Sequence, residues 1–207
     1  MIMKKELNYI RVDEALGGNQ DWFLDPFMKG GGCAAVTACD LCIYFAQQKG
    51  IKELYPYDAK NPDKENYIRF SKQMKPYLRP RWQGIDTLDI YLEGIRAYWR
   101  DVECKALTAE GLSGTASFDI AKEAVRRQID KEIPIPFLLL HHKEPRLKDY
   151  VWHWFNLAGY EEFEEEFFVK AVTYGEMEWL NLRELWDTGF EKKGGMILLG
   201  LTETEGS

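Results

Sequence analysis

The chain has 207 residues, 45% of them hydrophobic, and its 27 Lys and Arg against 34 Asp and Glu give a formal net charge of −7. This length predicts one domain over residues 1–207 with one sizeable core. The acidic balance argues against a nucleic-acid partner, which usually requires a basic surface, and against strong attraction to anionic membranes. No apolar run reaches the roughly 20 residues of a membrane span, so we expect no membrane partner either.

The cysteines and the N-terminus indicate a cytoplasmic protein. No apolar stretch follows Lys4 and Lys5, so the segment does not look like a secretory signal. Three of the four cysteines, Cys33, Cys39 and Cys42, lie within ten residues of one predicted helix. That clustering makes a poor disulfide framework, and we expect reduced thiols.

The N-terminal half is predicted to be helical after an irregular start. Residues 1–30 show no regular pattern and lead into the glycine run 30–32. Small and apolar residues then dominate nearly all round residues 33–50, which predicts a buried helix that ends at Gly50. The next helix is expected to start at Asn61–Pro62 with its apolar stripe on Tyr67, Phe70, Met74 and Tyr77. Two more are expected, from near Asp86 and from Ser117, whose hydroxyl would cap the helix.

After residue 132 the hydrophobic period changes from helical spacing to alternation. Strands are predicted at residues 133–140, 151–160, 167–174, 178–182 and 196–201, with a short helical turn at 182–186. Helices followed by consecutive strands indicate an α+β fold, with a helical N-terminal half packed on a C-terminal antiparallel β-sheet.

Cys33 stands where a glycine run meets the predicted buried helix. A thiol at a helix N-terminus experiences the positive end of the macrodipole and unpaired backbone N–H groups, which predicts a lowered pKa and a nucleophilic thiolate. The glycines would allow a substrate backbone to approach closely. The alternative is that Cys33 is one more small core residue of that helix.

His153 is the second candidate. In the strand predicted at 151–160 it shares a face with Phe155, while Trp152 and Trp154 point to the opposite face. A histidine at the rim of a sheet can meet a helix N-terminus and accept the proton of a thiol. The alternative is a core histidine with one nitrogen satisfied.

These segments, in this order, resemble papain-like cysteine peptidases. The glycine run before Cys33, the Pro-containing strand 133–140 and the segment from His153 to Gly159-Tyr160 carry the resemblance, which covers roughly residues 30–182. It is strongest to the bacterial branch related to the peptidases that remove double-glycine leaders from bacteriocins.

The resemblance implies Cys33 as nucleophile and His153 as general base. It also implies an orienting Asp or Asn on the following strand and an upstream glutamine at the oxyanion. The chain departs from both: the orienting position falls near Thr173, where there is no Asp or Asn, and the only upstream glutamine, Gln20, lies thirteen residues before Cys33. A poorly oriented imidazole would lower the rate.

Other motifs predict structure instead of chemistry. Cys39 and Cys42 form a C-x-x-C inside a helix and are expected in the core. His141 and His142 are adjacent on a strand end and point to opposite faces, so we expect neither a metal nor a cofactor. The acidic run 161–166 is expected to be a solvated hairpin, which could favour basic substrates.

The sequence therefore predicts a cysteine-dependent amide-bond hydrolase that acts on a peptide or amide substrate, without a metal or cofactor. Two alternatives remain open: a catalytically inactive papain-like binding domain, and a Cys-His acyltransferase that acts on a small molecule. The substrate and the oligomeric state are left open.

Overall fold

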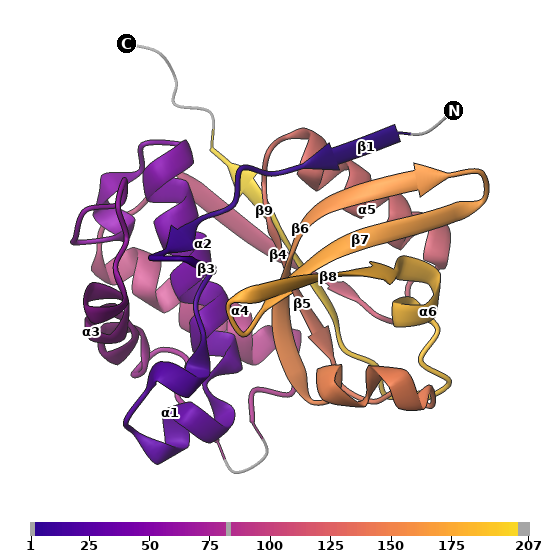
Figure 1. The fold of residues 1–207 in the computed structure, drawn as a ribbon, viewed down its shortest axis with the longest axis horizontal. Coiled ribbons are helices and arrows are strands. Elements are labelled where there is room, and N and C mark those ends of the chain that lie inside the picture. Colours follow the sequence, from indigo (N-terminus) through magenta and orange to yellow (C-terminus); the bar gives the residue numbers. More distant parts are fainter. Residues whose placement is uncertain (1–2, 82–83, 203–207) are drawn as a thin grey trace.

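The computed structural model describes residues 3–81 and 84–202 (Figure 1). Within these residues, four helices lie between the first and second strands of the main sheet in the chain, and two later helices pack together beside its strands. The helices are α1 (Pro26–Gly31), α2 (Cys33–Gln48), α3 (Lys64–Met74), α4 (Leu88–Asp101), α5 (Phe118–Asp130) and α6 (Leu182–Trp186), with short 3-10 turns η1 (Gln20–Trp22), η2 (Lys52–Leu54) and η3 (Pro145–Tyr150).

One mixed-length antiparallel sheet supports the C-terminal half. Within the described residues its strands follow the order β4-β9-β5-β6-β7-β8, and β1 pairs with the distal part of β6. The strands are β1 (Met3–Glu6), β4 (Leu107–Ser113), β5 (Ile135–Leu139), β6 (His153–Phe163), β7 (Glu166–Thr173), β8 (Glu176–Asn181) and β9 (Gly195–Leu201), with β2 (Arg11–Val12) and β3 (Ala15–Leu16) forming a separate short hairpin. The predicted α+β architecture is confirmed.

The structure differs from the predicted secondary structure in three places. The first thirty residues are not irregular, since β1 joins the sheet and α1 extends into the glycine run, with Gly30 and Gly31 as its last residues. Strand β4 was missed because Glu110-Gly111 interrupts its alternation, and only its pairing with β9 makes it a strand. Helix α3 begins at Lys64 instead of Asn61, because the Asp63 carboxylate accepts the Asn66 N–H and caps the helix.

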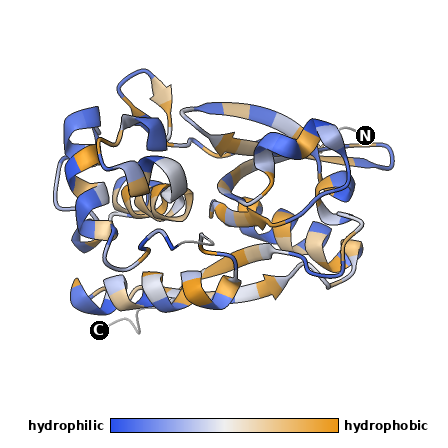
Figure 2. Ribbon diagram, turned by 90° about the horizontal axis from the view of Figure 1, so that it is seen from below, coloured by the Kyte–Doolittle hydropathy of each residue, from blue (hydrophilic) through white to orange (hydrophobic). Residues whose placement is uncertain are grey.

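Helix α2 is the centre of the core, as its composition predicted. Every residue from Ala34 to Ala46 is buried, and the helix packs against β6, α3 and η2. Cys39 and Cys42 are fully buried core residues, as expected. Helices α3, α4 and α5 bury apolar residues on one side and carry hydrophilic residues on the other, and hydrophilic and hydrophobic stretches alternate along the helices in Figure 2. No helix within the described ranges has the length and apolar character needed to cross a membrane.

A β-bulge divides strand β6 into two parts. The register with β7 shifts between Leu157 and Tyr160, and a bulge changes the face to which the following side chains point. Before the bulge, Asn156 donates to the Thr37 carbonyl of α2 at 3.2 Å. After it, Tyr160 donates to Asp130 of α5 at 3.0 Å. Even-numbered residues of β6 therefore contact α2 before the bulge and α5 after it.

Candidate active site

Cys33 is the first residue of α2 and is half-buried. Gly32 links it to α1, and only glycine fits there because a Cβ atom would lie 2.3 Å from the Met28 carbonyl oxygen. The first N–H groups of a helix have no intrahelical acceptor. The amides of Cys33 and Ala34 accordingly lie near the thiol, where both lower its pKa.

His153 is the first residue of β6 and is 5% exposed. Its Nε2 is hydrogen-bonded to Thr173 Oγ1 at 2.7 Å. The ring of Tyr174 stacks parallel to the imidazole with 4.9 Å between centroids. Thr173 and Tyr174 together fix the ring orientation, and this leaves Nδ1 as the nitrogen available to a thiol. The role of Tyr174 was not predicted from the sequence.

The turn between β7 and β8 brings both of these residues to the imidazole. Thr173 pairs with Glu176, so the loop has only two residues, and both have positive φ: 52° at Tyr174 and 79° at Gly175. These are the angles of a type I′ hairpin turn. The Tyr174 carbonyl accepts a hydrogen bond from the Asn19 side chain at 2.9 Å, which ties the turn to the segment that contains Gln20.

Gln20 also lies at the site, despite its distance from Cys33 in sequence. Its Nε2 donates to the Lys29 carbonyl at 3.1 Å, while Oε1 is buried and has no hydrogen-bond partner among the described residues. The amide group has a second N–H, which is the donor that an oxyanion would need.

A buried carboxylate explains why the Gln20 segment folds back onto the site. Asp40 lies on α2 and accepts hydrogen bonds from the Gly18 N–H at 3.0 Å, Tyr67 at 2.7 Å and Tyr9 at 3.1 Å. Burial raises the pKa of Asp40 to about 7, against the effect of these donors. Gly18 is held so closely that a Cβ atom would overlap the Tyr67 hydroxyl, at 1.9 Å.

All four residues named from the sequence, Gln20, Cys33, His153 and Thr173, line one small cavity of about 10 Å³. Among the hydrogen bonds of the described residues, none joins the Cys33 thiol to the His153 imidazole. Such contacts are often long in empty active sites and shorten only when substrate binds. The tertiary structure thus places the four candidates together without a preformed thiol–imidazole bond.

The prediction that the helix N-terminus lowers the pKa of Cys33 was wrong. Burial raises the pKa of the thiol, and the amides of Trp154, Ala34 and Cys33 only partly oppose this. Burial also lowers the pKa of His153 to about 4. Because desolvation disfavours the charged form of each group, the resting pair is a neutral thiol and a neutral imidazole. Desolvation therefore outweighs the helix N-terminus at this site.

A second, much larger cavity opens the site to solvent. This cleft has a volume of about 990 Å³, and Cys33, His153, Gln20 and Tyr174 are among the residues that line it. Trp152, with a left-handed φ of 56°, is 45% exposed and lies in the cleft wall. Trp154 is instead buried, stacked on Tyr91 at 4.4 Å. The two tryptophans that flank His153 thus have different roles.

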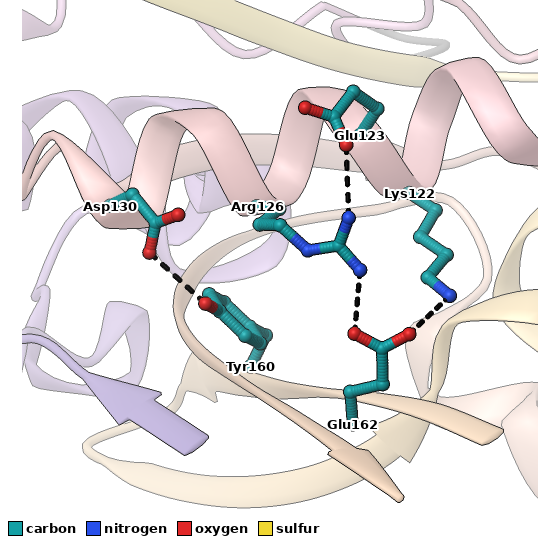
Figure 3. Close-up of polar contacts among 6 residues, drawn as sticks. All are labelled: Lys122, Glu123, Arg126, Asp130, Tyr160 and Glu162. Atoms are coloured by element: carbon teal, nitrogen blue, oxygen red, sulfur yellow. Dashed lines mark hydrogen bonds and ion pairs between the residues drawn. The ribbon is translucent and has the colours of Figure 1, made fainter. Parts of the chain in front are cut away.

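Two further expectations concern groups outside the site. Among the described residues, no cluster of His, Cys, Asp and Glu could hold a metal ion. The acidic run 161–166 does form the β6–β7 hairpin, but Glu162 is not simply solvated. Its carboxylate pairs with Lys122 and Arg126 of α5, both at 2.5 Å (Figure 3).

No protein-family model matches the chain, and no curated protein matches it. Among solved structures, the chain is similar to one titled "Crystal Structure of Pseudomonas Avirulence Protein AvrPphB". The match covers 90% of this chain and 96% of that chain, with 8% identity and a TM-score of 0.37. At this level of similarity, any functional assignment depends on the residues of the site themselves.

Proposed function

We propose that this protein is a papain-like, cysteine-dependent amide-bond hydrolase that acts on peptides. The observation that carries the proposal is the shared cavity of Cys33, His153, Gln20 and Thr173, with Thr173 bonded to the imidazole. These groups come from four separate segments, and general-base activation of a thiol needs this combination of types. As part of the same proposal, we place the protein in the bacterial branch that resembles the bacteriocin-leader peptidases.

The neutral resting pair defines the first chemical step. As Cys33 Sγ attacks the substrate carbonyl, its proton passes to His153 Nδ1, so that no isolated charge is held in the buried site beforehand. The imidazolium then donates this proton to the leaving amine, and a thioester remains on Cys33. Water, deprotonated by the same imidazole, hydrolyses the thioester and restores the thiol.

Thr173 replaces the carboxylate or amide that the sequence lacks. For His153 to act as the base, the Thr173 hydroxyl oxygen must accept the hydrogen bond from Nε2–H, which leaves the Nδ1 lone pair free. A hydroxyl is a weaker acceptor than a carboxylate, so it stabilises the transient imidazolium less. The second N–H of the Gln20 amide and the backbone N–H of Cys33 would stabilise the oxyanion.

A peptide library read by mass spectrometry tests this function. We expect cleavage by the wild type and by Cys39→Ala, the matched buried-cysteine control, and none by Cys33→Ala or His153→Ala. Thr173→Val keeps the shape of the side chain but removes the acceptor, so kcat should fall about tenfold or more with little change in KM. Thr173→Asn should restore much of the rate.

Cleavage that persists in Cys33→Ala would refute the proposed nucleophile. A wild type that binds library peptides but neither cleaves them nor accumulates a thioester would instead support the inactive binding domain.

A further inference from the structure

The cleft beside Cys33 differs in charge from the chain as a whole. The chain has a net charge of −7, yet the cleft contains more cations than anions. Its charged lining consists of Lys75, Arg79, Arg81, Lys192, Asp86 and Asp149. A local excess of positive charge on an acidic protein creates a field that attracts anionic groups to this one place.

Two of the four cations are already neutralised. Lys192 pairs with Asp86 at 3.1 Å, and Lys75 pairs with Asp25. Arg79 and Arg81 are exposed and take part in no ion pair within the described ranges. An arginine side chain offers five N–H donors in a planar fork that matches a carboxylate. These two side chains are therefore available to an acidic ligand.

The segment that carries these arginines lies against the end of α1, close to Cys33. They flank Pro80, whose Cβ lies 3.3 Å from the position that a Cβ atom would take on Gly31. Gly31 is two residues before Cys33, and apart from the adjoining residues and the backbone of α1 itself no atom lies within 4 Å of the corresponding position on Gly30. A substrate backbone that passes over the glycines toward Cys33 would thus lie next to the arginine-bearing loop.

The cleft also offers an apolar surface. Phe27 is 73% exposed and Trp152 is 45% exposed, and both line the cleft with Pro26 and Val151. Large aromatic side chains that remain exposed in a concave site are typical of binding surfaces. Asp149, from η3, is the remaining acid of the lining.

From these observations we infer the substrate class of the site: an extended peptide segment that carries acidic side chains next to an apolar or aromatic residue. This inference rests on the proposed function for its chemistry but not for its binding. It reverses the expectation that the acidic run 161–166 favours basic substrates. That run lies at the far end of β6, and Glu162 is paired there with Lys122 and Arg126.

The test measures binding without turnover. Three peptides of equal length share one aromatic residue and one dye and differ only in carrying Glu, Gln or Lys at two positions. Fluorescence anisotropy with Cys33→Ala protein should show that the Glu peptide binds about fivefold or more tightly than the Gln peptide, the scale of two exposed ion pairs. This preference should shrink at high salt.

Charge reversal locates the effect. Arg79→Glu with Arg81→Glu, in the same Cys33→Ala background, should abolish or invert the preference. The matched control, Arg127→Glu with Lys131→Glu, changes net charge equally at exposed positions on and just after α5 and should leave the preference intact. Equal effects of both reversals, a preference for the Lys peptide, or no binding of the Glu peptide would overturn the inference.

The inference and the proposed function can fail separately. Cleavage of neutral peptides by Cys33 without any acidic preference would refute the inference alone. An acidic preference that depends on Arg79 and Arg81, in a protein that forms no thioester, would support the inference and refute the proposed hydrolase.

Discussion

The two ends of strand β6 hold their polar groups in opposite ways. At the Glu162 end, carboxylates, Lys122 and Arg126 are partly exposed and neutralise one another, and Tyr160 donates to Asp130 (Figure 3). At the His153 end the imidazole is buried, and burial alone accounts for its lowered pKa. Groups near solvent stay charged and form ion pairs, whereas a desolvated site favours the neutral forms of its groups until a reaction transfers a proton.

The comparison predicts that the His153 end depends mainly on packing. Trp154 is 1% exposed, stacks on Tyr91 and donates its indole N–H to the Ile85 carbonyl at 2.6 Å. Trp154→Ala should lower the free energy of unfolding by about 3–5 kcal/mol, measured by urea denaturation. Trp154→Phe retains an aromatic stack and should cost clearly less. Similar costs for the two variants would show that the hydrogen bond, not packing, dominates.

The pH dependence of stability should show two opposing contributions at this end. The pKa of His153 is lowered from 6.5 to about 4, so the unfolded chain binds a proton that the native state does not, and stability falls as pH decreases through this window. The contribution is at most about 3 kcal/mol. The pKa of Asp40 is raised from 3.8 to about 7, so its contribution is present at low pH and is lost as pH rises to 7.

Single substitutions should separate these contributions. As pH rises from about 4 to 6.5, the free energy of unfolding of His153→Gln should fall more steeply than that of the wild type. Asp40→Asn, which resembles the protonated acid, should show the opposite change. Urea midpoints measured across this range provide the data. Parallel profiles for the two variants and the wild type would contradict the buried, neutral description of the site.

The smallest effect is expected at the other end of the strand. Glu162→Gln removes the partner of Lys122 and Arg126, and the free energy of unfolding should fall by about 1 kcal/mol or less. The loss should diminish at high salt and at a pH low enough to protonate Glu162, whose pKa these partners lower. Glu164→Gln, at an exposed position of the same hairpin, is the control and should change little. A large, salt-independent fall in the free energy of unfolding would show that these ion pairs are shielded from solvent.

Local rules of sequence were enough for most elements and for the choice of candidates. Ser117 caps α5 because its hydroxyl accepts the Ile120 N–H, and Gly50 follows α2 with a φ of 71°. Cys33 and His153 were singled out by their positions at a predicted helix start and near a predicted strand start, and the resemblance to papain-like cysteine peptidases over residues 30–182 gave them their roles. The caps and the two positions need only neighbours within a few residues, which is why the chain itself carries that signal.

Only the tertiary structure decided how the candidates are combined. Gln20 reaches the site because Asp40 binds Gly18 across 22 residues of chain, and Thr173 orients His153 because a two-residue turn places it there. The pKa of Cys33 rises instead of falling because burial outweighs the helix N-terminus. Burial and long-range contacts depend on the whole packed molecule, so hydrophobic periodicity and residue spacing, which are local properties, could not predict them.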